Sequence, residues 1–183
     1  MANHMAKRLD KSEWQFTVVD QHATHYYQPG FLFVPFGTYK PEQTMKPKAN
    51  FIPKGVEFIQ KGVEIIETDK NTVTLADGES IEYNVLIVAT GARIVPDEVD
   101  GLSGDHWHQS AFDFYTIEGA VALRDKLATW EGGHLVVHIA EMPIKCPVAP
   151  LEFALLADDY FRRKRIRDNV KITYVTPMSA AFT

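Results

Sequence analysis

The residue best suited to chemistry is Cys146, the only cysteine among 183 residues. It follows Lys145 within EMPIKCPVAPLE (141–152), and Pro150 suits the first turn of a helix that begins a few residues later. A neighbouring cation and a helix N-terminus both favour the thiolate, the nucleophilic form of cysteine. A lone cysteine is more often a small buried hydrophobic residue. The sequence therefore leaves two hypotheses for Cys146, a reactive thiol and a packed side chain.

Asp20 is a second candidate, because it closes an apolar, β-branched run within WQFTVVDQ (14–21). In dinucleotide-binding folds, an acid at the end of such a strand hydrogen-bonds a ribose hydroxyl. Its usual companion is a glycine-rich phosphate turn about 20 residues earlier. That turn would lie before Met1. Asp20 is therefore either a ribose ligand without its phosphate loop or a solvated strand end.

Thr90 and Gly91 belong to a third candidate stretch, LIVATGA (86–92). A glycine at the end of a buried strand lets another group approach the backbone closely. A strand that ends in Ala-Thr-Gly is typical of flavoproteins, where it brings backbone against FAD. The alternative is a glycine that only serves the turn after a strand.

The elements around Cys146 form a strand–helix–strand pattern. HLVVHIA (134–140) and VKITYVT (170–176) have the composition of buried strands. Apolar residues from Phe153 to Tyr160 recur at helical spacing between them. A second Rossmann half normally carries a glycine-rich pyrophosphate turn after its first strand, but this chain has prolines and a thiol there. We expect the turn after the strand at 134–140 to keep the Rossmann-like fold but not to bind NAD(P).

The residues before this pattern predict a different set of elements. Asp77-Gly78 is a strong hairpin-turn signal between short apolar runs. We expect the end of a helix at 2–11, a buried parallel strand at 14–21, an irregular aromatic and proline-rich segment at 22–55, a β-meander up to a buried strand within YNVLIVATGA (83–92), a linker at 93–110, and a helix at 116–130.

This order predicts an α/β fold of two FAD/NAD(P)-binding, Rossmann-like halves with a β-meander, both incomplete. Residues 1–105 would form a partial FAD-binding domain that lacks its first strand and its glycine-rich turn. Residues 106–183 would form a partial second Rossmann-like domain that carries Cys146. Parallel sheets are normally buried on both faces, so we expect a chain truncated at both ends.

Composition excludes several classes of function. The chain is 45% hydrophobic and 23% charged, as in ordinary globular proteins, and its formal net charge of -5 gives no general attraction to nucleic acid. No apolar run approaches the roughly 18 residues of a membrane-spanning helix, and no signal peptide is recognisable. No histidine or cysteine spacing suggests a metal site. The basic run FRRKRIR (161–167) is expected to be the solvated end of a helix, with an acidic-lipid contact as the weaker alternative.

Four stretches together resemble sulfide:quinone oxidoreductases, FAD-dependent and membrane-associated flavoproteins with two dinucleotide-binding domains. They are TVVDQHATHYYQPGFLFVPFG (17–37), FIPKGVEFI (51–59), LIVATGA (86–92) and MPIKCPVAPLEFALLADDYFRR (142–163). The resemblance runs from about residue 2 to residue 183. HYYQPG and KCPVAP carry most of its specificity, because NADH-using relatives have a glycine turn in the latter place.

The resemblance implies FAD as cofactor and sulfide and quinone as substrates. Cys146 resembles the redox cysteine that lies next to the isoalloxazine and takes up sulfide sulfur, with two electrons passing through FAD to quinone. The implied cofactor-binding residues are Asp20 with Gln21 for the ribose, Gln28 and Pro29 near the flavin, Gly62 and Val63 for the adenine, and Thr90 and Gly91.

The departures from the family leave alternatives open. The family uses a pair of cysteines, whereas this chain has one, so we expect the parent protein to be the active enzyme and these residues alone to be inactive. The second enzymatic interpretation is a related flavoprotein acting on another thiol or persulfide, or an NADH:quinone oxidoreductase. The third is an inactive, truncated nucleotide-binding module. The expected location is cytoplasmic, or peripheral on the inner membrane for the full-length protein.

Overall fold

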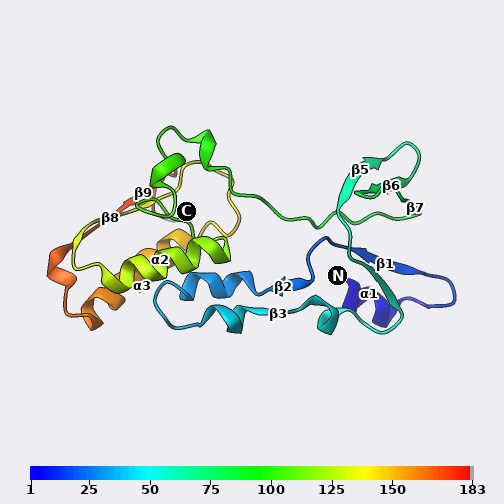
Figure 1. Ribbon diagram of the computed structural model, residues 1–183, viewed down its shortest axis with the longest axis horizontal. Helices are drawn as coiled ribbons and strands as arrows, with labels where there is room; N and C mark the ends of the chain where they lie inside the picture. Colours follow the sequence, from blue (N-terminus) through cyan, green and yellow to red (C-terminus); the bar gives the residue numbers. More distant parts are fainter. Residues whose placement is uncertain (182–183) are drawn as a thin grey trace. The chain divides into compact units, whose positions relative to one another are not determined.

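The computed structural model describes residues 1–181 (Figure 1), which form two units. Unit 1 comprises Met1–Tyr26 and Met45–Thr90. Unit 2 comprises Tyr27–Thr44 and the described residues from Gly91 onward. The predicted domain boundary after residue 105 stays a prediction. The units contain both helices and strands, which agrees with an incomplete Rossmann-like α/β fold.

Unit 1 begins with α1 (Ala2–Arg8) and contains three small sheets in its described residues. β1 (Phe16–Val19) and β4 (Val56–Ile59) pair in parallel, which confirms the parallel strand predicted before Asp20. The predicted burial of this strand is wrong, because none of its four residues is fully buried among the described residues. β2 (Thr24–Tyr26) and β3 (Met45–Pro47) pair in antiparallel fashion. The segment between β2 and β4 contains only short pieces, the 3₁₀-helices η1 (Gln28–Phe33), η2 (Pro41–Thr44) and η3 (Lys48–Phe51) together with β3.

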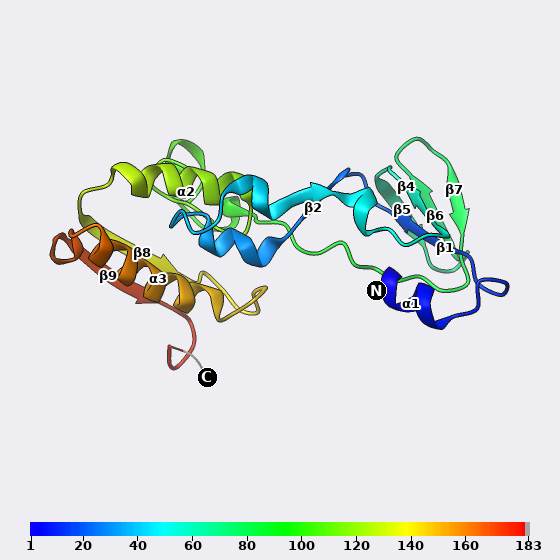
Figure 2. The ribbon, with the colours of Figure 1, turned by 90° about the horizontal axis from the view of Figure 1, so that it is seen from below.

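The third sheet of unit 1 is an antiparallel meander, visible in Figure 2. It consists of β5 (Val63–Glu67), β6 (Thr72–Leu75) and β7 (Ser80–Glu82). Gly78 takes a φ of 87° between β6 and β7, a conformation that glycine adopts without steric cost. The predicted turn at Asp77-Gly78 is therefore confirmed.

The predicted buried strand within residues 83–92 is wrong. Residues 83–95 form no helix or strand and belong to no sheet of the described residues. Val85 is 60% exposed and Val88 is 62% exposed. A strand exists only where its backbone finds a hydrogen-bonded neighbour, and no described strand pairs with this segment. Apolar composition predicted burial here but did not supply the partner that burial requires.

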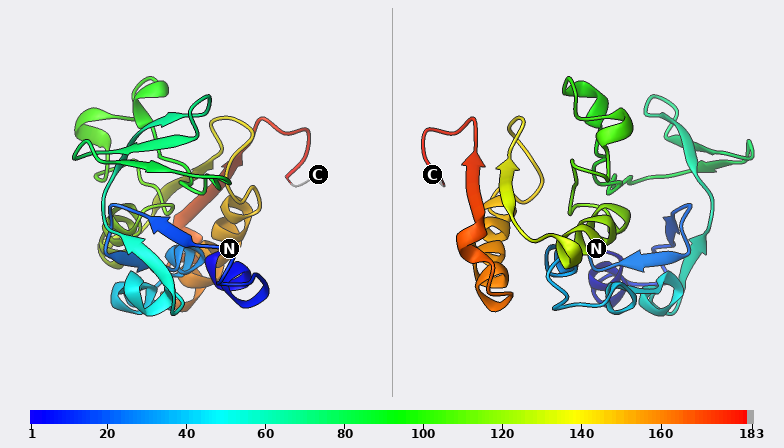
Figure 3. Two further views of the ribbon diagram at one scale, coloured as in Figure 1. Left: turned by 90° about the vertical axis from the view of Figure 1, so that its right-hand side faces the viewer. Right: turned by 60° about the vertical axis from the view of Figure 1, so that its left-hand side comes forward.

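Unit 2 contains the predicted strand–helix–strand pattern. β8 (Gly133–His138) and β9 (Val170–Val175) pair in parallel and lie side by side in Figure 3, with α3 (Ala149–Arg163) connecting them. Burial along β8 alternates, since Val137 is 6% exposed and Val136 is 50% exposed. Among the described residues the strands are therefore covered on one face, by α3, which agrees with the expectation that this chain does not complete the burial of its second sheet.

Helix α2 (Ile117–Thr129) confirms the helix predicted at 116–130 and has both ends satisfied by side chains. At its start, the Thr116 hydroxyl accepts a hydrogen bond from the Gly119 amide at 3.0 Å. At its end, the Lys164 ammonium donates to three main-chain carbonyls, those of Leu127, Ala128 and Trp130. Such contacts replace the hydrogen bonds that the helix itself cannot make at its termini.

The basic run 161–167 is largely engaged within unit 2. Arg162 and Arg163 pair with acids one helical turn earlier, Asp158 and Asp159. Arg167 also binds Asp158, and Lys164 binds the end of α2. These contacts fit the hypothesis of a helix end better than a lipid contact. Within residues 1–181, no helix combines the length and apolar character needed to cross a membrane.

The core of unit 2 includes side chains from the irregular segment 27–44. Leu32 and Phe36 are buried together with apolar residues of the helices and strands: Leu123, Leu127, Val137, Phe153, Ala157, Phe161 and Val170. The Phe36 ring centroid lies 5.0 Å from that of Phe153 and 5.6 Å from that of Tyr160. The burial of Leu32 and Phe36 in this core fixes η1 beside the helices. It also places Gln28 and Pro29 next to the turn that carries Cys146.

The burial of Phe36 in the core of unit 2 predicts that truncating its side chain lowers stability strongly. Because the ring is 6% exposed, Phe36→Ala should lower the free energy of unfolding of unit 2 by about 3–5 kcal/mol, through lost burial and a cavity. Phe51→Ala, at a ring that is 43% exposed, is the matched control and should cost clearly less. Urea denaturation followed by circular dichroism measures both. An equal loss of unfolding free energy in the two variants would contradict the burial of Phe36 in the core.

Candidate functional site

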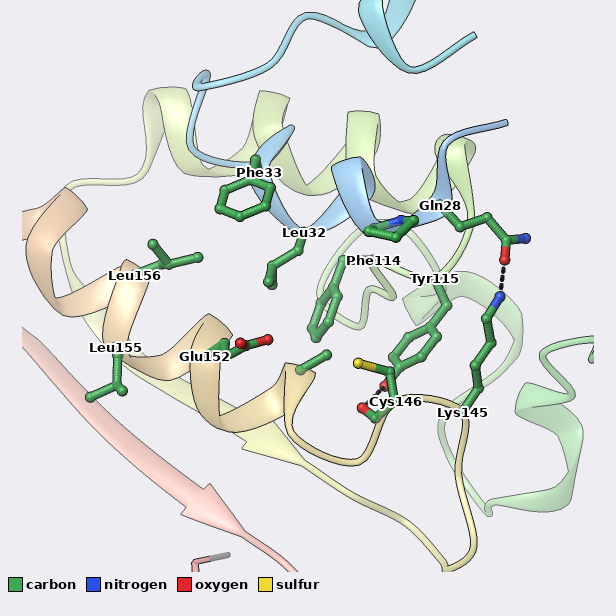
Figure 4. A pocket seen from close by; sticks show the side chains of 12 residues that line it. Gln28, Leu32, Phe33, Phe114, Tyr115, Lys145, Cys146, Glu152, Leu155 and Leu156 are labelled. Carbon is green, nitrogen blue, oxygen red and sulfur yellow. Dashed lines mark hydrogen bonds between the residues drawn. The ribbon is translucent and has the colours of Figure 1, made fainter. Parts of the chain in front are cut away.

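A pocket of about 720 Å³ lies within unit 2, and Cys146 is part of its wall (Figure 4). Four segments supply its lining. Gln28, Pro29, Leu32 and Phe33 come from η1, Phe114 and Tyr115 precede α2, Lys145 and Cys146 form the turn before α3, and Ala149, Glu152, Leu155 and Leu156 come from α3. Most of these side chains are apolar, and Cys146, Glu152, Tyr115, Lys145 and Gln28 provide the polar groups.

The Cys146 side chain is exposed, so the hypothesis of a packed cysteine is wrong. In Figure 4 its sulfur points from the turn toward the apolar wall of the pocket. The residue has a φ of 54°, in the left-handed region that non-glycine residues seldom adopt. Its carbonyl accepts hydrogen bonds from the Ala149 amide at 3.0 Å and the Tyr115 hydroxyl at 3.3 Å. A strained backbone at an exposed nucleophile is a common feature of functional sites.

The structure brings three predicted residues, Gln28, Pro29 and Cys146, to one pocket, and Lys145 links two of the segments that line it. The Lys145 ammonium donates a hydrogen bond to the side-chain oxygen of Gln28. It therefore points toward η1, although the sequence argument placed its charge beside the thiol. Helix α3 begins at Ala149, three residues after Cys146, as the sequence predicts.

Tyr115 is a lining residue that the sequence argument missed. Its backbone amide donates to the carboxylate of Asp113 at 2.9 Å, and its hydroxyl reaches the carbonyl of Cys146. Burial, followed by the negative charges that Cys146 and Tyr174 carry when ionised, raises the pKa of Tyr115 to about 12. The hydroxyl therefore keeps its proton and remains a hydrogen-bond donor at neutral pH.

Glu152 was also missed, although a signal for it exists. Glu152, Leu155 and Leu156 follow one another at three and four positions along α3, so they share one helical face. A helix that begins near Pro150 therefore places this face beside the turn of Cys146. No comparable local signal marks Tyr115, because its contact with Cys146 joins residues 31 positions apart.

Asp20 lies in unit 1, where the carboxyl ends of β1 and β4 meet. One carboxylate oxygen accepts the His22 amide at 2.8 Å, and the other pairs with the Lys48 ammonium. Partial burial opposes ionisation of Asp20, but the hydrogen bonds from Lys48 and His22 outweigh it and lower the pKa of this carboxyl. Asp20 is therefore a partnered carboxylate rather than an isolated solvated strand end.

Gln21, Gly62 and Val63 lie in the same part of unit 1 as Asp20. A Cβ atom built on Gly62 would lie 3.6 Å from the side-chain oxygen of Gln21. The Gly62 carbonyl accepts a hydrogen bond from the Ala76 amide at 2.9 Å, and Val63 is 43% exposed. Four of the predicted cofactor-binding residues are thus neighbours on one unit.

Thr90 and Gly91 are exposed within segment 83–95. Gly91 has a φ of 77°, and a Cβ atom added to it would meet no described atom within 4 Å. Its conformation requires glycine, but the described residues provide no close backbone approach there. Among residues 1–181, no three His, Cys, Asp or Glu side chains gather in a way that could hold a metal ion.

The left-handed turn predicts an unusual order of stability for two variants. Cys146→Gly should be more stable than Cys146→Ala by about 1 kcal/mol, because only glycine adopts this φ without steric cost. Thermal unfolding of the two variants side by side measures the difference. An alanine variant at least as stable as the glycine variant would exclude the left-handed turn.

The Asp20–Lys48 pair predicts a pH-dependent contribution to stability. Since the folded-state pKa of Asp20 is lowered, its contribution is present above the unfolded pKa of about 3.9 and is lost as the pH falls through the folded value. Asp20→Asn should therefore cost less than about 1 kcal/mol near neutral pH, because the Asp20 carboxylate is still partly accessible to solvent, which screens the pair. Below the folded pKa, where the carboxyl is protonated in both the folded and the unfolded state, it should cost nothing.

Urea denaturation across this pH range measures the effect of Asp20→Asn. Asp69→Asn, at an acid on the exposed turn between β5 and β6, is the control and should show no such loss. A cost for Asp20→Asn that stays constant down to the lowest pH would contradict the pairing with Lys48.

Comparison with known proteins places these residues in context. The chain matches no family model. It is 27% identical to the mitochondrial sulfide:quinone oxidoreductase of Dictyostelium discoideum over 94% of this chain and 38% of that protein. It is 29% identical to the sulfide-quinone reductase of Aquifex aeolicus over 88% of this chain and 37% of that protein.

A solved structure agrees with the sequence comparisons. The crystal structure of the Aquifex aeolicus sulfide:quinone oxidoreductase covers 94% of this chain with a TM-score of 0.75 and 28% identity, and the match covers 39% of that protein. The chain thus spans about two fifths of the length of the relatives it matches. Over nearly all of its own length, it is similar in sequence and fold to sulfide:quinone oxidoreductases, as the motifs around Asp20, Thr90 and Cys146 predict.

Proposed function

We propose that the chain contributes to an FAD-dependent oxidoreductase that oxidises sulfide at Cys146 and delivers the electrons to a quinone. Similarity to sulfide:quinone oxidoreductases supports a flavoprotein oxidoreductase with FAD as its cofactor. The observation that carries the proposal to a specific residue is the exposed Cys146 thiol in the wall of an apolar pocket.

The proposed chemistry needs a thiolate and an electron acceptor. Joining the sulfur of HS⁻ to the Cys146 thiolate forms one S–S bond, releases one proton and removes two electrons. FAD, when bound, would supply the acceptor for these two electrons, and quinone would be their final acceptor, taking up two protons with them. The residues of the pocket hold the thiol at an apolar surface formed by Leu32, Phe33 and Phe114, where a flat ring system can lie beside it.

The residues proposed for the adenosine part of FAD are those around the ends of β1 and β4. A carboxylate has about four lone-pair positions, so Asp20 can accept a ribose hydroxyl while it keeps its contacts with Lys48 and His22. Gln21, Gly62 and Val63 offer neighbouring polar and backbone groups. We assign Gln28 and Pro29, which line the pocket with Cys146, to the flavin side, and Thr90 and Gly91 also remain proposed cofactor contacts.

The turn before α3 favours sulfide over NADH as the electron donor. Pro143, Pro147 and Pro150 occupy the place of a glycine-rich turn, and a pyrophosphate needs close approach to backbone amides. The carbonyl of Cys146 is turned to the Tyr115 hydroxyl and the Ala149 amide. Proline has no backbone N–H, so these three positions cannot donate to a pyrophosphate, and the turn presents a thiol in their midst.

The proposal predicts flavin reduction by sulfide that depends on Cys146. The protein is expressed from its natural gene and purified with FAD bound. Sulfide added to it under anaerobic conditions should bleach the flavin absorbance. Cys146→Ser should slow this at least about 100-fold, because the nucleophile is lost. Met142→Leu, which removes a different sulfur four residues away, is the matched control and should leave the rate unchanged.

Each other outcome supports an alternative. Bleaching by NADH but not by sulfide would identify an NADH:quinone oxidoreductase. Bleaching by another thiol or a persulfide alone would identify a related flavoprotein. A protein that binds no flavin and reacts with neither donor would be a nucleotide-binding or pairing module without redox activity.

A further inference from the structure

We propose that Tyr115 is a positioning residue for Cys146. The Tyr115 hydroxyl holds the turn before α3 so that the Cys146 thiol faces the pocket. This inference rests on the proposed role of Cys146 as the reacting thiol. It adds to that role a residue of another segment, 31 positions earlier in the chain.

The turn at Cys146 needs to be held because its backbone conformation is unfavourable for a residue with a Cβ atom. Two hydrogen bonds meet at its carbonyl oxygen. The bond from the Ala149 amide is local and closes the turn on itself. The bond from Tyr115 comes from the segment before α2, so it alone of the two fixes the turn relative to the rest of the pocket.

Tyr115 is itself held firmly. Asp113 is 9% exposed and accepts hydrogen bonds from the amides of Tyr115 and Thr116, at 2.9 and 2.7 Å. The same carboxylate accepts the Thr116 hydroxyl, and His108 lies 3.3 Å from it. The start of α2 is therefore a fixed base from which the tyrosine reaches the turn.

The aromatic side chains beside Tyr115 restrict its ring. Phe114 stacks on Phe153 of α3, with centroids 4.7 Å apart and planes inclined by 4°. The rings of Phe114 and Tyr115 stack at 5.3 Å and 26°. Since Phe153 belongs to the core and α3 follows the turn directly, the hydroxyl and the carbonyl it binds are anchored to one packed unit.

The contact between Lys145 and Gln28 does not replace this bond. Both side chains are exposed, and a lysine side chain carries large rotamer freedom. Tyr115 is half-buried, and burial raises its pKa, so its donor stays available at neutral pH. Tyr115 is therefore the more rigid of the two connections between the turn and its surroundings.

The test measures the direction in which the thiol faces, using two electrophiles on the full 183-residue chain. N-phenylmaleimide reacts faster when its phenyl ring can lie against the apolar wall of the pocket. Iodoacetamide is small and polar, so it gains little from that wall. The preference is the rate with N-phenylmaleimide divided by the rate with iodoacetamide, measured in the folded protein and normalised to the same quotient in urea. For the wild type this preference should be about 10. The single cysteine makes the measurement specific for Cys146.

Tyr115→Phe removes only the hydroxyl and should lower this preference at least about threefold. Tyr160→Phe is the matched control, because it removes another tyrosine-to-carbonyl bond of 3.3 Å in unit 2, the one to Leu127. It should keep the wild-type preference. Circular dichroism first establishes that both variants are folded, and Tyr115→Leu, which also lacks the hydroxyl, replaces the phenylalanine variant if that one is not.

Two outcomes would overturn the inference. A folded Tyr115 variant with the full preference would show that the hydroxyl does not set the direction of the thiol. A wild type without any preference would show that the thiol does not face the pocket. Neither outcome concerns sulfide-dependent flavin reduction, so a failure of the positioning role is distinguishable from a failure of the proposed function.

Discussion

The site in unit 2 depends on the burial of Leu32 and Phe36 among the side chains of α2, α3 and β8. The segment that carries these two residues has little regular structure of its own, so its position is set by where its side chains are buried. Its first residues, Gln28 and Pro29, thereby become part of the wall that faces Cys146. One packing interaction thus converts a long irregular segment into a fixed side of the pocket.

Three local facts support the proposed role of Cys146. The turn is left-handed, the thiol is exposed, and the helix that follows supplies the opposite wall through Glu152, Leu155 and Leu156. In unit 1, the parallel pair of β1 and β4 brings Asp20, Gln21 and Gly62 together in a comparable way. In both units the polar residues stand where strands or helices end, which is where open α/β folds place their ligands.

The elements around Cys146 were predictable from the sequence because their signals are local. Strand-forming residues, Pro150 and helical periodicity define β8, α3 and β9 without reference to distant parts of the chain. The packing of residues 27–44 against α2 and α3 was not predictable, since aromatic residues in an irregular segment carry no period. The direction of Lys145 and the role of Tyr115 also escaped, because adjacency in sequence does not determine which way a side chain points.

The exposed segment 83–95 has a consequence for how the protein behaves at high concentration. VLIVAT (85–90) contains no charge, proline or glycine, is rich in β-branched residues, and has no sheet partner among the described residues. A six-residue stretch of this kind offers its free backbone groups to the same stretch of another molecule. A charged side chain at Val85 or Val88 would disfavour such pairing between two copies of this stretch.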